Sequence, residues 1–426
     1  MIIDLGMKRP NIGNNLFSGD QSSWVSPLGQ GTHTPSGRGG ADEHPLYTGR
    51  HFLIQREEES NKGKTKKILE SKWGLTVAET SDFITEGVNE NNIHGADALI
   101  YTELGITLLG VEDESIRLLQ SLDADYFIAP EKVVYVADDI LGESSAPSTW
   151  GIRASGAIDS RYTGAGVRVA VLDTGFDSSH PDFNGREITP SSFVPDEAIQ
   201  DRHGHGTHCI GTACGSRSGE GLRYGVATQA HIFAGKVLSD RGSGAQSWVL
   251  NGITWAAKSE CKVISLSLGT PVLPGQVYDI AYERAARFAR LKGAVLVAAA
   301  GNESNRSEER YSPVGSPADC PSILAGAALD EGLSIANFSN REINPSGKVD
   351  IAAPGTAIYS SWPMPTRYHT LSGTSMATPH VAGILALLFE KYPDASPSEI
   401  EQELLRQAKA LPLAAEDVGA GLCTAP

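Results

Sequence analysis

Residues 167–173, with the sequence VRVAVLD, form a short apolar run that is almost uninterrupted and ends in a carboxylate. Four further runs follow along the chain, separated by helix-like patterns: HIFAGKVL at 231–238, KVISLSL at 262–268, AVLVAAA at 294–300 and SILAGAAL at 322–329. Such runs predict strands buried on both faces, as in a parallel sheet covered by helices. Ligands of these sheets bind beyond the carboxyl ends of the strands. Polar residues that follow the runs are therefore the first candidates for a functional site.

Four polar side chains stand out, two where such runs end and two where helical patterns begin. Asp173 ends the first run, where its carboxylate could orient an imidazole or only hold a turn. His205 lies in the string HGHGTH, directly before a helical pattern. Asn302 follows the fourth run and offers an amide to an oxyanion, or makes a Gly-Asn turn. Ser375 begins a helix that is apolar nearly all round, so it is either a nucleophile beside orphan N–H groups or an N-cap.

The histidine string also permits a metal interpretation. His203, His205 and His208 have the spacing H-x-H-x-x-H, which can place imidazoles around zinc. A metal hydrolase is therefore one alternative, and a non-catalytic binding protein on the same fold is another. Without a metal, His208 is a structural residue of the helix and His203 a loop residue.

Together, four strings resemble the subtilisin-like serine proteases in motif, order and spacing: AVLDTGFDSSHPDF, HGHGTHCIGT, AAAGNES and GTSMATPHVAG. The resemblance covers roughly residues 148–425 and implies an α/β fold with three layers and a mainly parallel central sheet. It implies a serine endopeptidase in which Ser375 is the nucleophile, His205 the base and Asp173 the group that orients it. Asn302 and the backbone N–H of Ser375 would bind the oxyanion.

The same resemblance implies where an extended polypeptide substrate binds. One segment would pair with the substrate backbone as a neighbouring strand, and a second would form the opposite wall. Glu303, beside the primary specificity pocket, would admit basic as well as apolar side chains. The residues of the two segments are Gly242, Ser243 and Gly244, and Ser267, Leu268 and Gly269.

No cofactor is expected for catalysis, and structural calcium is the one metal that the resemblance implies. Asp182 matches a usual ligand, but GSRSGEGLRYG at 215–225 departs from the calcium loop of bacterial subtilisins and is closer to the proteinase K branch. Five cysteines are too few and odd in number for a disulfide framework. Cys209 is expected to be a buried thiol near the site.

The chain before the protease part divides into three segments. Residues 1–48 are rich in Gly, Ser, Pro and Asn and predict a flexible arm. Residues 49–139 combine strand-like runs (HFLIQ, ALIYTEL, ITLLGV, KVVYVA) with helix-like ones (GKTKKILESKW, ESIRLLQSL), which indicates a small α+β unit. This unit resembles the family's ferredoxin-like propeptide, which is a folding chaperone and an intramolecular inhibitor. Residues 140–149 predict a linker with an autoprocessing site near Ser145–Ala146, ahead of a peptidase domain at 150–426.

Composition limits the partners. The formal net charge of −16 repels phosphate backbones, so polypeptide substrates are expected and nucleic acid is not. No run of about 20 apolar residues predicts a membrane span, and a monomer is expected. The first residues lack the apolar core of a secretory signal, which favours a cytoplasmic protein, one exported by another route, or a secreted protein whose signal was removed.

Overall fold

The computed structural model describes residues 46–56, 64–83, 87–88, 92–93, 95–110, 126–136, 140–141, 150–219 and 221–426. Most of the predicted arm, the predicted helix ESIRLLQSL and the predicted cleavage point near Ser145–Ala146 lie outside these residues. The chain forms two compact units, one ending at Val133 and including Ala245–Ser247, the other comprising the remainder from Val134. The division falls ahead of the boundary predicted at residue 139, because the segment from Val134 pairs with strands of the second unit.

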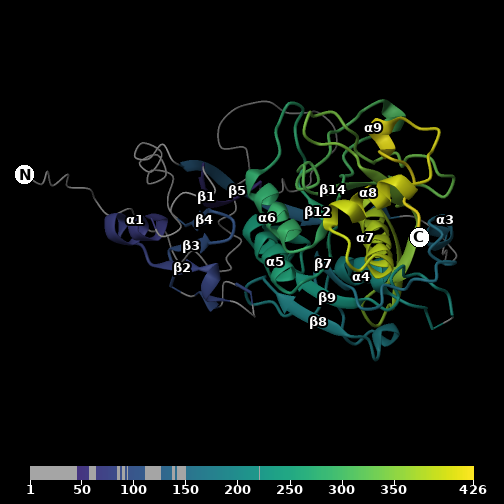
Figure 1. The fold of residues 1–426 in the computed structure, drawn as a ribbon, viewed down its shortest axis with the longest axis horizontal. Coiled ribbons are helices and arrows are strands. Elements are labelled where there is room, and N and C mark those ends of the chain that lie inside the picture. Colours follow the sequence, from purple (N-terminus) through teal and green to yellow (C-terminus); the bar gives the residue numbers. More distant parts are fainter. Residues whose placement is uncertain are drawn as a thin grey trace, which may run out of the picture. The chain divides into compact units, whose positions relative to one another are not determined.

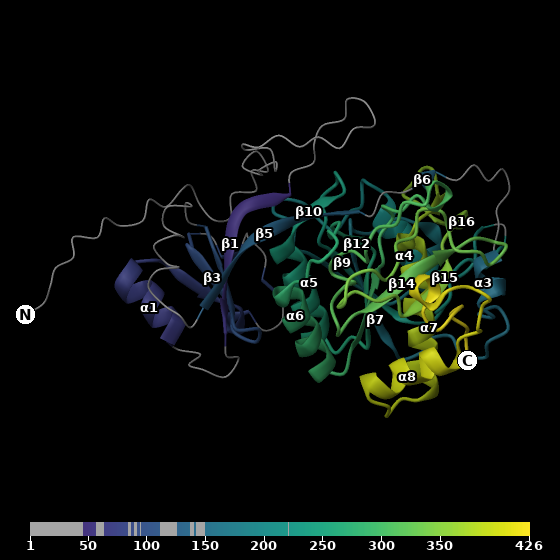
Figure 2. The same cartoon turned by 90° about the horizontal axis from the view of Figure 1, so that it is seen from above.

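The first unit is the small α+β unit that the sequence predicts. Strand β1 (Tyr47–Gln55), which begins just inside the predicted arm, pairs antiparallel with β4 (Ile106–Leu109) and with β5 (Tyr126–Val136). β3 (Ala98–Tyr101) is antiparallel to β4, and β2 (Val77–Glu79) is parallel to β3. Helix α1 (Lys64–Trp73) covers one face of these strands (Figure 2), where Leu69 joins a core that includes Leu53 and Leu109.

The second unit is built on the parallel sheet that the apolar runs predict. All five runs form strands, and their registers are parallel throughout. The strand order is β15 (Ile351–Pro354), β14 (Leu324–Leu329), β13 (Val295–Ala299), β11 (Val263–Leu266), β7 (Arg168–Asp173), β9 (His231–Lys236) and β8 (Ile188–Ser192).

Helices cover both faces of this sheet, which gives the three layers that were predicted. Figures 1 and 2 show α5 (Gln246–Lys258) and α6 (Ile280–Leu291) on one side of the strands, with α4 (His205–Cys214) and α7 (Thr374–Lys391) on the other. All residues of α7 from Thr374 to Phe389 are buried, as expected for a helix that is apolar nearly all round.

Shorter elements complete the second unit. They are α3 (Trp150–Ala154), α8 (Pro397–Gln407), α9 (Ala415–Val418) and an antiparallel sheet of β16 (Ile358–Ser361), β17 (Tyr368–Ser372) and β6 (Ile140–Leu141). Among the helices of the described ranges, none has both the length and the apolar character needed to cross a bilayer. All five cysteines are buried, and none forms a disulfide.

The carboxyl ends of the central strands meet at one edge of the sheet. Asp173 is the last residue of β7 and stands in register with Lys236, the last residue of β9. The ends of β11 and β13 lie alongside, and Ser267 and Asn302 follow them in the chain. Helix α4 begins at His205 and α7 begins at Thr374. The fold thus brings the ends of several central elements together for the site.

Candidate active site

Asp173 and His205 form a buried, hydrogen-bonded pair. Nδ1 of His205 lies 2.7 Å from Oδ1 of Asp173, and both side chains have no exposed surface. The same Oδ1 accepts a hydrogen bond from the backbone N–H of Thr174, also at 2.7 Å. Because a carboxylate can only accept, Nδ1 carries the proton in this contact, which leaves the basic lone pair on Nε2.

Ser375 is buried in the first turn of α7, and its backbone is held by neighbouring segments. Pro379 has no N–H with which to bond the carbonyl of Ser375 within the helix. That carbonyl instead accepts from Oγ of Ser267 at 2.9 Å and from the thiol of Cys209 at 3.6 Å. Oγ of Ser375 donates to the carbonyl of Ser267 at 3.2 Å.

Cys209 connects the nucleophile candidate to the imidazole. Its Sγ lies 3.8 Å from Nδ1 of His205 while it bonds the Ser375 carbonyl, so His205 and Ser375 meet around one buried sulfur. Burial raises the pKa of the Cys209 thiol to about 11, which keeps it protonated at neutral pH. The expectation of a buried thiol near the site is confirmed.

Asn302 is oriented by Thr374, the residue before Ser375. Oδ1 of Asn302 accepts from the backbone N–H of Thr374 at 2.9 Å and from its hydroxyl at 2.8 Å. The hydroxyl donates to Asn302 because it already accepts from the N–H of Gly301. A Cβ placed on Gly373 would lie 3.2 Å from Nδ2 of Asn302 and 3.6 Å from N of Ser375. Nδ2 of Asn302 and the backbone N of Ser375 therefore border one space that a glycine keeps open, as an oxyanion hole would require.

The two predicted substrate walls flank a strand of the chain itself. Val136 is opposite Leu268 in β12 (Leu268–Gly269), and Tyr135 is opposite Gly269, in an antiparallel register. On the other side, the N–H of Val136 donates to the carbonyl of Gly242 at 2.8 Å. Gly242 directly precedes β10 (Ser243–Ala245), which contains the rest of the predicted edge segment. Both walls thus bind an extended backbone through main-chain groups.

Glu303 lies on the turn after Asn302 and is exposed. Its Oε2 accepts from Nδ2 of Asn340 at 2.5 Å, and its N–H donates to Oδ1 of the same side chain at 3.1 Å. The carboxylate is therefore held in place next to the residue that borders the oxyanion space.

The histidine string does not form a metal site. Within the described ranges, the only group of three or more His, Cys, Asp or Glu side chains at ligand distance is Asp173, His205 and Cys209, and its thiol is protonated. Nε2 of His208 lies 3.0 Å from the carbonyl of Ile358, and burial lowers the pKa of His208 to about 3. His208 is thus a structural residue of α4, as predicted, and the zinc alternative finds no support.

The surroundings of Asp182 do not fit a calcium ion. Oδ2 of Asp182 accepts from the hydroxyl of Tyr224 at 2.9 Å, and the hydroxyl of Tyr368 lies 3.1 Å from both carboxylate oxygens. Calcium needs six to eight oxygen ligands, whereas here hydroxyl protons meet the carboxylate. Asp182 also belongs to no group of three potential ligand side chains among the described residues. The expectation of calcium at Asp182 is therefore not supported by the geometry.

Some residues that organise the site were missed by sequence reasoning. Asp201 is fully buried and accepts hydrogen bonds from the residues on both sides of His205, and Thr174 and Lys236 belong to the same network. Asp201 stands four positions before His205, in the string DRHGHGTH, so a carboxylate close to the histidine was the available signal.

Comparisons with known proteins show the family to which this part of the chain is similar. Residues 164–421 match the model of the subtilase family. Subtilisin E of Bacillus subtilis is 40% identical over 278 residues, which cover 64% of this chain and 69% of that protein. Thermitase of Thermoactinomyces vulgaris is 40% identical over 252 residues, covering 59% of this chain and 81% of thermitase. The solved structure of sphericase superposes with a TM-score of 0.57 at 32% identity, over 66% of this chain and 99% of sphericase.

Proposed function

The chain belongs to the subtilase family and is a subtilisin-like serine endopeptidase, and from this premise we propose that Asp173, His205 and Ser375 cleave extended polypeptides through an acyl-enzyme. The observation that carries the proposal is the buried contact of 2.7 Å between Asp173 and His205, with Ser375 reached through the shared neighbour Cys209.

In the proposed reaction, Oγ of Ser375 attacks the scissile carbonyl and its proton passes to Nε2 of His205. Asp173 stabilises the imidazolium that forms. The oxygen of the tetrahedral intermediate becomes negative between Nδ2 of Asn302 and the N–H of Ser375. When the C–N bond breaks, His205 returns the proton to the leaving amine. A water molecule then hydrolyses the ester by the same steps in reverse, and Ser375 regains its proton.

Substrate recognition is proposed to run through the main chain. An extended segment would pair with the walls at Gly242–Gly244 and Ser267–Gly269, as Val134–Val136 does here. Pairing through backbone groups favours broad specificity and a locally unfolded substrate. The held carboxylate of Glu303 supports acceptance of basic side chains beside apolar ones.

We propose further that the precursor inhibits and processes itself. Val134–Val136 occupies the edge that a substrate would use, which supports inhibition by the segment preceding the protease part. A few residues later, Ile140 pairs with Ser372 in β17, the strand that leads into Ser375. Val136 and Ile140, on the two sides of residues 137–139, thus both pair with strands of the protease part. This supports a cut between Val136 and Ile140, closer to the unit's end than the cut expected from sequence near Ser145–Ala146.

Two measurements test this function. A sulfonyl fluoride should abolish casein cleavage and leave an adduct that peptide mapping assigns to Ser375, while a thiol reagent at neutral pH leaves activity unchanged. Intact-mass spectrometry should find the wild-type chain cut and the Ser375→Ala chain at full length. Ser398→Ala, at an exposed serine of α8, is the matched control and should be cut like wild type. Cleavage of casein by the Ser375→Ala chain at the wild-type rate would refute the proposal.

A further inference from the structure

Thr174, the residue after Asp173, is fully buried and uses every polar group it has. Its N–H donates to Oδ1 of Asp173 at 2.7 Å, and its carbonyl accepts from Nζ of Lys236 at 2.5 Å. Its hydroxyl donates to Oδ1 of Asp201 at 3.0 Å and accepts from the N–H of Gly206 at 2.8 Å. Thr174 therefore links the end of β7, through its backbone N–H, to the first turn of α4, through its hydroxyl.

Asp201 extends this attachment to both sides of the histidine. Its Oδ1 accepts from the N–H of Gly204 at 2.8 Å, directly before His205. Its Oδ2 accepts from the N–H of Thr207 at 2.8 Å and from the Thr207 hydroxyl at 2.7 Å. A negative charge with several donors at the start of a helix is stabilising, and it fixes the backbone on which His205 stands.

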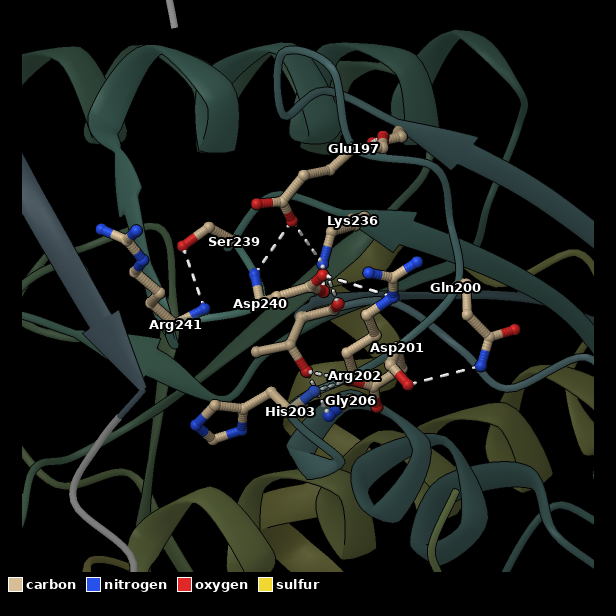
Figure 3. A network of polar contacts seen from close by, with 12 residues as sticks. Glu197, Gln200, Asp201, Arg202, His203, Gly206, Lys236, Ser239, Asp240 and Arg241 are labelled. Carbon is tan, nitrogen blue, oxygen red and sulfur yellow. Dashed lines mark hydrogen bonds and ion pairs between the residues drawn. The ribbon is translucent and has the colours of Figure 1, made fainter. Parts of the chain in front are cut away.

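Lys236 fixes the other end of the network. The ammonium has no exposed surface and lies 2.8 Å from Oδ1 of Asp240 and 3.1 Å from Oε2 of Glu197. Figure 3 shows the side chains of Asp240 and Glu197 directed toward it, with Asp201 beside Gly206 and His203. A buried cation paired in this way has few alternative positions, because any of them would leave a charge without a partner. The Thr174 carbonyl therefore accepts from an ammonium group whose position is fixed by its ion pairs.

The helix approaches Thr174 closely enough that no side chain fits between them. A Cβ on Gly206 would lie 2.3 Å from the carbonyl oxygen of Gly175 and 3.1 Å from the N of Thr174. Because Gly206 has no side chain, its backbone can come close enough for its N–H to donate to the Thr174 hydroxyl.

From these contacts we infer that Thr174 is a positioning residue for the reaction, and that its hydroxyl sets the distance between Asp173 and His205. The inference rests on the proposed triad. Asp173 and His205 sit on different elements, β7 and α4, and each is bonded to Thr174 directly or through the neighbouring Gly206. Loss of the hydroxyl leaves the N–H of Gly206 without its acceptor and lets the start of α4 move relative to Asp173.

The test compares Thr174→Val with Thr174→Ser, because valine keeps the shape and serine keeps the hydroxyl. For Thr174→Val we expect kcat on a peptide substrate to fall roughly 10- to 100-fold, since a misplacement near 1 Å can cost that much, while KM changes less than about twofold. Thr174→Ser should stay within about threefold of wild type. A weaker contact between Asp173 and the imidazolium lowers the pKa of His205, so the acid limb of the kcat/KM profile should move to lower pH in Thr174→Val.

Thr212→Val is the matched control. Thr212 is a fully buried threonine of the same helix, and its hydroxyl donates to the carbonyl of His208 at 3.1 Å. Its kcat and pH profile should equal those of wild type. All values of kcat are calculated from the concentration of active sites, which is titrated with a sulfonyl fluoride. Differences in the folded fraction between variants then do not affect kcat. If Thr174→Val yields no folded chain, Asp201→Asn takes its place, with the same expected loss of kcat.

The possible outcomes distinguish a failure of the positioning role of Thr174 from a failure of the proposed protease function. Wild-type kcat in Thr174→Val or in Asp201→Asn overturns the positioning role, as does a Thr174→Ser chain as defective as the valine variant. Failure of the wild-type chain to be acylated at Ser375 overturns the proposed function instead.

Discussion

Replacing Asn302 by aspartate removes the proposed oxyanion donor and keeps the hydrogen bonds that Thr374 donates to the side chain at position 302. An aspartate oxygen can still accept from the N–H and hydroxyl of Thr374, the contacts of 2.9 and 2.8 Å that hold Asn302 now. The other oxygen takes the place of Nδ2, which borders the space over Gly373 at 3.2 Å. Loss of such a donor costs about 10²- to 10³-fold in kcat, or about 2.7–4 kcal/mol. Repulsion between the carboxylate and the forming oxyanion should add to this, so we expect at least the upper value.

Asn302→Ala provides the comparison. It also removes the donor, but it leaves two buried donors of Thr374 without an acceptor, each at a cost of about 1–3 kcal/mol in unfolding free energy. We therefore expect the alanine variant to lose both kcat and stability, whereas the aspartate variant loses kcat and keeps its unfolding temperature. KM should change little in both, because the interaction forms fully only in the transition state.

The assay is steady-state hydrolysis of a chromogenic peptide, with thermal unfolding measured on the same samples. Asn337→Asp, at an exposed asparagine, introduces the same charge outside the site and should behave as wild type. A kcat within about fivefold of wild type for Asn302→Asp would refute the assignment of Nδ2 as an oxyanion donor, because no such donor is worth so little.

Three further predictions concern the triad, a buried histidine and the tyrosine contacts. Asp173→Asn should lower kcat about 10⁴-fold in the peptide assay, because an amide favours the wrong tautomer of the imidazole. Burial lowers the pKa of His208 from 6.5 to about 3, so between these pH values the unfolded chain binds a proton that the folded chain does not. The unfolding free energy, measured in urea, should therefore be highest above pH 6.5 and should decrease as the pH falls toward 3. The decrease should be smaller in His208→Gln. Tyr224→Phe and Tyr368→Phe each remove a hydroxyl bonded to the Asp182 carboxylate and should lower the unfolding free energy by about 1.5–3 kcal/mol. A chelator should change the unfolding temperatures of the wild type and of Asp182→Asn equally, and a drop confined to the wild type would show that calcium binds at Asp182 after all.

The central sheet was predictable because a strand that is buried on both faces has an almost continuous run of apolar residues in its sequence. Runs such as VRVAVLD contain almost no polar residue, and each of the five became a strand of the parallel sheet. Strands with weaker composition were not recognised. β8, with the sequence ITPSS, lies at the edge of the sheet and is only partly buried, so nothing in its composition distinguishes it from a loop.

The four candidate site residues were predictable because each follows a buried strand or begins a buried helix. Their supporting groups were not. Asp201 acts through contacts with Thr174 and with the start of α4, and those contacts exist only once β7 and α4 are packed together. The contacts of Tyr224 and Tyr368 with Asp182 could not be predicted either, because the two tyrosines lie far apart in the sequence and meet only in the folded chain.

Pro379 removes one rung from the hydrogen-bond ladder of α7, at the carbonyl of the reactive serine. As a result, the peptide group of Ser375 is held sideways, by Ser267 and by the sulfur of Cys209, and not lengthwise by its own helix. We therefore expect the direction of the Ser375 hydroxyl to depend on the size of the side chain at position 209. Exchanging Cys209 for a smaller or larger residue should change this direction and also the position of His205, whose Nδ1 lies 3.8 Å from the same sulfur.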